Sequence, residues 1–218
     1  MKRLVIFDWD GTLMDSTGRI VECLCLAAAD ARLPALAPEQ ARSIIGLGLP
    51  EAIRTLYPGI GQEDAENMRQ HYARHFIAAE AVPSVLFPGV RELLDQIAGH
   101  GVLMAVATGK SRRGLDRVWQ GSDLAGYFAA SRCADESRSK PHPAMVHELL
   151  DELDIRAEHA LVVGDTSFDL EMASNAGVES VAVSWGAHSR DLLAQYSPRM
   201  VLDDIRGILP LLTNLEIA

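Results

Sequence analysis

Residues 4–12 read Leu-Val-Ile-Phe-Asp-Trp-Asp-Gly-Thr, an apolar run that ends in two closely spaced acidic side chains. The continuous run from Leu4 to Phe7 is typical of a strand buried on both faces of a parallel sheet. Asp8 and Asp10 are therefore expected just past the carboxyl end of a buried strand, where open α/β sheets bind ligands. Two carboxylates this close repel each other unless a cation or a shared proton compensates. An isolated Asp-x-Asp-Gly is more typical of a turn, so its meaning depends on the rest of the chain.

The rest of the chain alternates between apolar runs and helix-like segments. Similar apolar runs recur at 102–107, 160–163 and 180–183, with a weaker one at 200–202. Helical periodicity separates them at 90–100, 111–120, 143–153, 168–176 and 190–196. Alternation of this kind predicts a doubly wound α/β domain with a parallel sheet.

Residues 16–84 break this alternation, because they have helical periodicity throughout and no convincing strand. The expected helices cover 19–32, 38–45, 50–56 and 63–80. Pro83 and Pro88 then end the helix and stiffen the chain as it returns. We therefore expect an α-helical domain at 16–84, inserted into a core made of residues 1–15 and 85–218.

Composition and charge exclude several classes of function. The formal net charge of the chain is −10, which repels nucleic acid and anionic membranes, so neither is an expected partner. The cysteines Cys23, Cys25 and Cys133 have no metal-ligand spacing and do not suggest a disulfide framework. The apolar run at 4–7 is far shorter than a signal peptide or a membrane span requires. We expect a cytoplasmic protein.

Three further polar motifs occur where other strands end or where the chain is rigid. Thr108-Gly109-Lys110 follows the second apolar run and supplies a hydroxyl and backbone N–H groups at the same edge of the sheet. Lys140 precedes Pro141-His142-Pro143, a setting more rigid than a solvated surface lysine requires. Residues 164–169, Gly-Asp-Thr-Ser-Phe-Asp, again follow a buried strand and precede a helix. Taken singly, the first is typical of a turn and the last of a helix cap.

The order of these motifs, Asp-x-Asp-Gly-Thr, Thr-Gly, Lys-Pro and Gly-Asp-x-x-x-Asp, resembles that of the haloacid dehalogenase superfamily. The resemblance covers residues 1 to about 185, and it is specific because four motifs occur in the right order and setting. The chain is similar in particular to the subgroup with a helical cap after the first motif, which includes phosphoglycolate phosphatases and β-phosphoglucomutases. The resemblance implies a Rossmann-like core, a mobile cap and Mg²⁺-dependent phosphate-ester chemistry.

Each acidic side chain has a physical role in such chemistry. Asp8 would attack phosphorus and form an aspartyl-phosphate, which splits one difficult displacement into two easier ones. Asp10 would protonate the leaving oxygen and then deprotonate the attacking water. Mg²⁺ prefers an octahedron of oxygen ligands and keeps several waters, so Asp8, the backbone carbonyl of Asp10 and Asp165 suffice from the protein side. Asp169 is then expected beside these ligands rather than among them.

The other candidates handle the negative charge of the substrate. Lys140 would neutralise the nucleophile and the oxygens of the transferring group. Thr108 and the N–H of Gly109 would hold the phosphoryl group as charge moves. Without the cation and the lysine, the clustered carboxylates would not accept an anionic substrate.

Other activities within the superfamily fit less well. A dehalogenase has a non-acidic residue at the position of Asp10, and phosphonoacetaldehyde hydrolysis uses a cap lysine, whereas residues 16–84 contain no lysine. A sugar-phosphate mutase would use the same groups, and the sequence does not separate it from a phosphatase. A binding or regulatory protein that has lost turnover is disfavoured, because every expected catalytic side chain is present.

Substrate choice is expected to depend on the cap. The loop Gly46-Leu47-Gly48-Leu49-Pro50 resembles the cap loop that faces the active site in this subgroup, or it only joins two helices. Arg54 is a candidate for binding a substrate carboxylate, since Arg suits planar bidentate recognition, or it is a solvated helix residue. The leading expectation is hydrolysis of a small phosphorylated metabolite such as phosphoglycolate.

Two further residues, Lys110 and His142, lie near the motifs. Lys110 either adds positive charge near the pocket or begins an exposed helix, and His142 is expected to be structural, because the acid–base role is already filled. No role is assigned to the other histidines.

Overall fold

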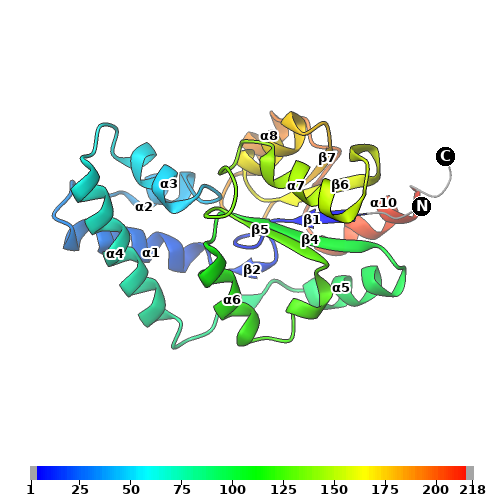
Figure 1. Ribbon diagram of the computed structural model, residues 1–218, viewed down its shortest axis with the longest axis horizontal. Coiled ribbons are helices and arrows are strands. Elements are labelled where there is room, and N and C mark those ends of the chain that lie inside the picture. The colour runs from blue at the N-terminus through cyan, green and yellow to red at the C-terminus, as the bar shows by residue number, and fades with distance from the viewer. Residues whose placement is uncertain (1–3, 215–218) are drawn as a thin grey trace.

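The computed structural model describes residues 4–214, and its centre is a six-stranded sheet (Figure 1). Every pairing between neighbouring strands is parallel. The strands lie side by side in the order β5 (Ala130–Cys133), β4 (Leu103–Thr108), β1 (Leu4–Phe7), β6 (Ala160–Gly164), β7 (Glu179–Val183) and β8 (Val201–Leu202). The central position of β1 agrees with its continuously apolar sequence.

Alternate side chains of β1 pack into two separate hydrophobic layers, as the two-residue period of a strand requires. Val5 and Phe7 belong to one layer, and Leu4 and Ile6 belong to the other. The first layer includes residues of α5 (Val90–Gly99), α6 (Arg112–Gln120) and α10 (Leu209–Asn214), and the second includes residues of α7 (Ala144–Leu153) and α8 (Ser167–Asn175). Helices thus cover both faces, and the predicted doubly wound, Rossmann-like α/β fold is confirmed.

The remaining elements are short. They are the helix α9 (Arg190–Ala194) and the 3-10 turns η1 (Ala125–Tyr127), η2 (Ala157–His159) and η3 (Ile205–Ile208). α9 packs Leu193 against Leu170 and Ala182 in a small cluster of its own.

Two parts of the sheet structure were not predicted from the sequence. β5 has the sequence Ala-Ser-Arg-Cys, which lacks an apolar run because the strand lies at the edge of the sheet. β2 (Met14–Asp15) and β3 (Val85–Leu86) are only two residues each and form a separate antiparallel pair. This pair joins the two points at which the chain leaves the sheet for the helices of residues 17–79 and returns from them.

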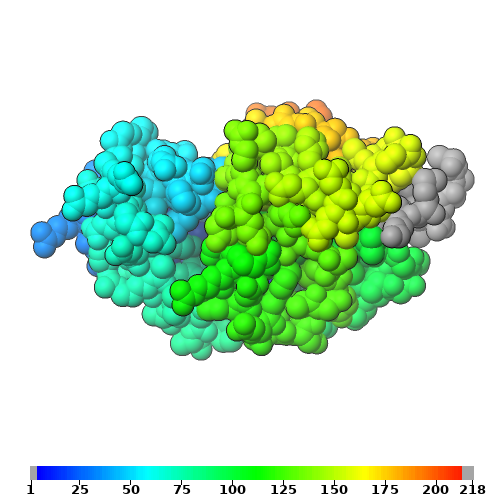
Figure 2. Space-filling model, in the orientation of Figure 1, coloured from blue at the N-terminus to red at the C-terminus, as the bar shows by residue number. Residues whose placement is uncertain are grey.

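Four helices between β2 and β3 pack around their own apolar cluster at one end of the molecule (Figure 1). They are α1 (Thr17–Asp30), α2 (Pro38–Ser43), α3 (Leu49–Leu56) and α4 (Gln62–Ala79), and we refer to them as the cap helices. The cluster includes Leu24 of α1, Ile53 of α3, and Met68 and Phe76 of α4. In Figure 2 their blue and cyan surface abuts the green surface of the sheet-bearing part. No helix within residues 4–214 is long and apolar enough to cross a membrane.

Candidate active site

The ends of β1, β4 and β6 bring three of the predicted motifs together. β1 pairs with β4 on one side and with β6 on the other, so that Phe7 is in register with both Val106 and Val163. Asp8, Thr108 and Asp165 therefore follow or end neighbouring strands at the same edge of the sheet. All three side chains are buried.

Lys140 lies between two carboxylates in this cluster. Its Nζ donates to Asp8 Oδ1 at 2.6 Å and to Asp169 Oδ1 at 2.6 Å. Burial alone would lower the pKa of Lys140, but the negative charges of Asp169 and Asp8 outweigh burial and raise that pKa above its usual range. The ammonium group is therefore charged at any pH at which the protein is expected to work.

The Asp165 carboxylate is held by groups from two other parts of the chain. Its Oδ1 accepts a hydrogen bond from Thr12 Oγ1 at 2.8 Å, and its Oδ2 accepts one from the N–H of Ala187 at 2.7 Å. Burial and the charge of Asp169 raise the pKa of Asp165 to about 7. Gly186 is required here, because a Cβ at that position would lie 2.1 Å from Asp165 Oδ2.

Both carboxylate oxygens of Asp169 already have partners. Oδ1 accepts from Lys140, and Oδ2 accepts from the N–H of Thr166 at 3.1 Å and from Thr166 Oγ1 at 2.6 Å. Thr166 and Asp169 also form a capping box at the start of α8. Asp169 is thus placed to fix the lysine and the helix, while Asp8 keeps an oxygen that is not used in this way.

The donor set of this cluster fits a divalent cation. Oxygens of Asp8, Asp165 and Asp169 lie within 4.8 Å of one another. Asp8 Oδ2 is buried and has no hydrogen-bond partner in the described part of the chain. Burial raises the pKa of Asp8 well above its ordinary value; the charges of Asp169 and Asp165 raise it further, and Lys140 lowers it. A second positive charge, supplied by an ion that prefers oxygen ligands, would relieve this repulsion.

Asp10 follows Asp8 by two residues in the loop after β1, and its carboxylate has different partners. Its carboxylate accepts a hydrogen bond from Ser16 Oγ at 2.5 Å, and its Oδ2 lies 2.8 Å from Lys110 Nζ. The Lys110 ammonium also lies 4.8 Å from the centre of the Phe76 ring of the cap helix α4. Of the two alternatives for Lys110, the structure supports positive charge at the site rather than an exposed helix start. No sequence pattern predicts the pairing of Lys110 with Asp10.

A cavity of about 380 Å³ lies between this cluster and the cap helices. Asp8, Asp10, Thr108 and Gly109 line it from the side of the sheet. Its opposite wall is mostly apolar and includes Ile20, Leu24, Ile44, Ile45, Leu47, Tyr72 and Phe76. The nucleophile and acid–base candidates thus line a partly open space large enough for a small metabolite.

The predicted cap loop contacts the core directly. The N–H of Gly48 donates to Ser139 Oγ at 2.8 Å. Gly46 has a φ of +105°, and a Cβ there would lie 2.8 Å from Thr166 Oγ1. A Cβ at Gly109 would lie 2.5 Å from the carbonyl oxygen of Leu47. Glycine at these positions therefore permits an approach that any other residue would obstruct.

Two of the sequence candidates lie elsewhere. Arg54 does not line the cavity: its side chain is 69% exposed and its nearest acidic partner is Glu51, at 3.9 Å. The predicted contact of Arg54 with a bound substrate therefore has no support in this arrangement. His142 Nδ1 accepts from the N–H of Ala144 at 3.1 Å, beside the start of α7, which agrees with a structural role.

His188 contacts both the site and the cap helices, and no sequence pattern singled it out. The ring is buried; Nδ1 accepts from the N–H of Ser167 at 3.0 Å, so Nε2 carries the hydrogen and donates to the carbonyl of Ser43 at 3.2 Å. Its own N–H donates to the carbonyl of Asp165 at 3.3 Å. His188 thereby links the Asp165 segment to the end of the cap helix α2. Only the folded arrangement brings residues 43, 167 and 188 together.

Comparison with known proteins identifies the class. Residues 5–183 match the family model described as haloacid dehalogenase-like hydrolase. The chain is 35% identical to "Probable phosphatase IndB" of Dickeya dadantii over 93% of this chain and 90% of that protein. It is 31% identical to "Phosphoglycolate phosphatase" of Pseudomonas savastanoi pv. phaseolicola over 96% of this chain and 79% of that protein. A hydrolase of Pseudomonas syringae, at 23% identity and full coverage of both chains, has the same fold, with a TM-score of 0.88.

The chain belongs to the haloacid dehalogenase-like hydrolase family. The resemblance on which the sequence interpretation rested is therefore confirmed. The predicted enzyme class, a phosphoric monoester hydrolase of this superfamily, is confirmed with it.

Proposed function

We propose that the chain is an Mg²⁺-dependent phosphatase that hydrolyses a small phosphate monoester through an aspartyl-phosphate on Asp8, with phosphoglycolate as the first candidate substrate. The observation that carries this proposal is the state of Asp8. One of its oxygens is bound by the buried ammonium of Lys140, and the other is buried without a hydrogen-bond partner in the described residues, beside a cavity. The substrate is taken from the phosphoglycolate phosphatases to which the chain is similar.

The chain's own groups are arranged for two displacements at phosphorus. Asp8 attacks and accepts the phosphoryl group, while Thr108 and the N–H of Gly109 hold its oxygens and Lys140 offsets their charge. Asp10 protonates the leaving oxygen and then takes a proton from the water that attacks the aspartyl-phosphate. The bond from Ser16 and the ion pair with Lys110 fix the direction of the Asp10 carboxylate for both transfers.

Asp8, the backbone carbonyl of Asp10 and Asp165 would hold Mg²⁺, and Asp169 would orient Lys140 beside them. Bound there, the ion offsets the charge of the carboxylates and of the phosphoryl oxygens. The buried, unpartnered oxygen of Asp8 supports this assignment, and the two partnered oxygens of Asp169 support a place for that residue outside the ligand set.

The cap would exclude bulk water during these steps. We propose that residues 16–84 act as a unit that closes over the site. The contacts of Gly46 and Gly48 with the core, and the donation from His188 to Ser43, support a closed arrangement in this structure.

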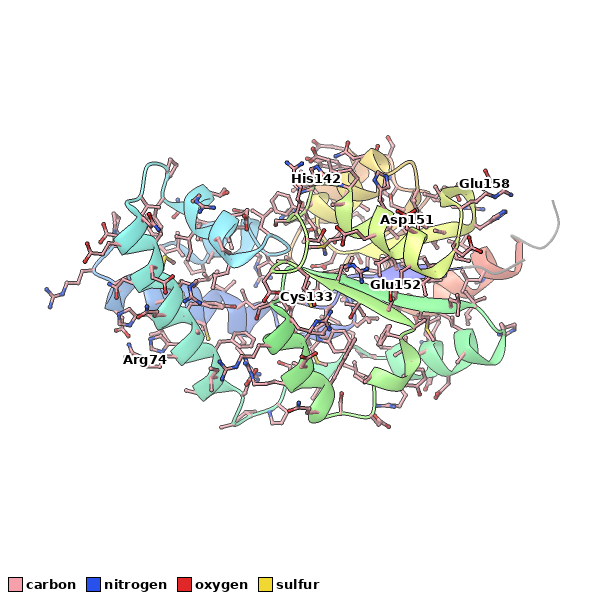
Figure 3. The ribbon with its side chains drawn as sticks, viewed as in Figure 1. Arg74, Cys133, His142, Asp151, Glu152 and Glu158 are labelled. Carbon is pink, nitrogen blue, oxygen red and sulfur yellow. The ribbon has the colours of Figure 1, made fainter. Side chains whose placement is uncertain are left out.

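The proposal is tested with a panel of small phosphate monoesters and Mg²⁺, measuring release of inorganic phosphate. We expect turnover by the native chain, loss of at least about 10³-fold in Asp8→Asn, and no change in Asp151→Asn. Asp151 is exposed on α7 and lies well away from the cap helices (Figure 3). Inertness of the folded native chain towards the whole panel would contradict the proposal. Transfer of phosphate between positions of a sugar, with no inorganic phosphate released, would favour the mutase instead.

A further inference from the structure

Four cationic side chains line the cavity, and three of them already have acidic partners. Arg113 is the fourth, and its guanidinium forms no hydrogen bond or ion pair with any residue in the range 4–214. The partnered ones are Lys110 with Asp10 at 2.8 Å, Arg69 with Glu66 at 2.6 Å and Arg117 with Glu80 at 3.0 Å. Arg113 is itself an exposed residue, so its guanidinium is solvated and, within the described residues, is the one of these four cations that is free to pair with a bound anion.

Arg113 lies near the residues proposed to bind the phosphoryl group. It lies in the first turn of α6, which begins just after Thr108 and Gly109. Gly114, next to it, also lines the cavity and has no side chain that would cover the guanidinium. The N-terminus of α6, capped by Ser111, adds partial positive charge to the same region. A group bound by Arg113 would therefore be close to, but distinct from, the phosphoryl group.

The opposite wall offers little else for recognising a leaving group. Leu47, Phe76 and Ile77 contribute hydrocarbon, and Tyr72 contributes one ring with a single hydroxyl. The one charged group that the described part of the chain places on this wall, Arg69, is already paired with Glu66. Such a wall offers few partners for the several hydroxyls of a sugar, and unpaired polar groups facing hydrocarbon lose their hydrogen bonds to water. Selection by charge at the guanidinium is the stronger means of discrimination that this cavity provides.

We propose that Arg113 binds a second anionic group on the substrate, a carboxylate or a second phosphate, and thereby selects short phosphate monoesters with a charged leaving group. The inference rests on the proposed function, since it needs a phosphate ester in the cavity. It transfers to Arg113 the role that the sequence suggested for Arg54, whose exposed side chain lies outside the cavity lining.

The test compares phosphoglycolate with 2-hydroxyethyl phosphate, in which a neutral hydroxymethyl group replaces the carboxylate. The measured quantity is the ratio of their kcat/KM values in the native chain, in Arg113→Gln and in Arg54→Gln. A charge-assisted hydrogen bond corresponds to about tenfold or more in affinity. We expect the native chain to prefer phosphoglycolate by about tenfold, and Arg113→Gln to lose most of this preference through a higher KM for phosphoglycolate. Arg54→Gln, a matched substitution of an exposed arginine, should keep the preference.

The two sources of the second anion are separated by adding ethylene glycol bisphosphate to the comparison. If kcat/KM for phosphoglycolate falls in Arg113→Gln, Arg113 binds a carboxylate. If kcat/KM for the bisphosphate falls, Arg113 binds a second phosphate. A preference that is equal in the native chain and in Arg113→Gln, or that disappears in Arg54→Gln instead, overturns the inference while leaving the phosphatase proposal standing. If the folded native chain hydrolyses none of these esters or any other of the panel, the proposed function fails, and this inference fails with it.

Discussion

Lys140 limits how much negative charge the site can hold in the absence of a metal ion. One buried ammonium bonds to the carboxylates of Asp8 and Asp169, and a third carboxylate, Asp165, lies close by. Removing one partner of a buried ion pair is costly, because the other charge is left uncompensated. Charge balance in the site therefore requires all of these residues together. No single motif predicts the site, because its charges come from segments far apart in the sequence.

Asp10 belongs to the same loop as Asp8 but has a separate task. We expect Asp10→Asn to lower kcat by about 10² to 10⁴-fold, because an amide cannot exchange a proton with the leaving oxygen or with water. The concentration of Mg²⁺ that gives half-maximal activity should change little, since the proposed ligand is the backbone carbonyl. Both values come from steady-state rates measured at several Mg²⁺ concentrations. A large loss of Mg²⁺ affinity would contradict the assignment of the Asp10 side chain.

At this scale the sequence predicted much of the candidate site. Asp8, Thr108, Lys140 and Asp165 were each selected because a polar side chain follows or ends an apolar run or stands in a rigid segment, and the structure brings them together. The pairing of Lys110 with Asp10 was not predictable. It depends on how the loop after β4 folds back over the loop after β1, and no local pattern reports that.

Among the secondary-structure elements, the cap loop and the segment after β7 control contact between the cap helices and the sheet. Gly46 and Gly48 permit close approach of the loop to the core, and His188 donates to the carbonyl at the end of α2. Two substitutions test whether these contacts serve activity as well as packing.

Gly46→Ala should impair activity more than stability. The new Cβ would lie 2.8 Å from Thr166 Oγ1, and the φ of +105° is one that alanine rarely adopts, so the loop has to move away from the core. We expect kcat/KM to fall by about tenfold or more. Gly18→Ala is the control: a Cβ there meets nothing within 4 Å, and alanine is compatible with the first turn of α1. Equal activity of the two variants would contradict a role for the loop.

His188→Ala should weaken the connection between the cap helices and the Asp165 segment. Loss of one net hydrogen bond should lower the ratio of closed to open molecules by roughly threefold to tenfold. We expect kcat/KM to fall by that factor and hydrogen–deuterium exchange to increase in the segment around Ser43. His147→Ala serves as the control, since His147 is exposed on α7. Unchanged exchange around Ser43 would show that this hydrogen bond does not hold the cap.

Prediction of elements from sequence succeeded where burial is uniform, indicated the edge strand β8 only weakly, and failed at the other edge strand, β5. β1, β4, β6 and β7 are runs buried on both faces, so hydrophobicity alone marks them. β5 contains Arg132, whose guanidinium pairs with Glu148 and Glu152 of α7. An edge strand can carry such a residue, and for that reason its sequence resembles a loop.

On the scale of the whole molecule, the acidic cluster links stability to pH and to Mg²⁺. The pKa of Asp165 is raised to about 7 from an ordinary value of 3.8, so the folded chain keeps a proton between these values that the unfolded chain releases. Stability without a metal ion should therefore fall as pH rises through that window. Mg²⁺ binds the ionised carboxylates, so it should raise the melting temperature more at about pH 8 than at about pH 5.5.

The comparison is made by thermal unfolding with Mg²⁺ or with a chelator at both pH values. Asp165→Asn should remove most of the Mg²⁺ effect, whereas Asp151→Asn should preserve it. A stabilisation by Mg²⁺ that is larger at the lower pH would contradict the linkage of ion binding to ionised carboxylates.

At this scale the sequence predicted the helix and sheet layers of the core and the edge of the sheet at which the motifs meet. It did not predict the cavity. Its walls come from α1, α4, α6 and the loop before α3, segments whose mutual placement is set by packing of the cap helices on the core. Arg54 and Arg113 illustrate the difference. Both lie on helices and are exposed, and only the folded structure shows that Arg113 lines the cavity and Arg54 does not.

The most direct measurement is chemical trapping of the enzyme during turnover. The chain is mixed with Mg²⁺ and phosphoglycolate, quenched in acid within a few milliseconds to seconds, treated with borohydride to reduce any aspartyl-phosphate to homoserine, and mapped by mass spectrometry. We predict homoserine at position 8, absent without substrate and absent from Asp8→Asn. Rapid phosphate release without modification of Asp8 at any quench time, or modification of a different carboxylate, would contradict the account.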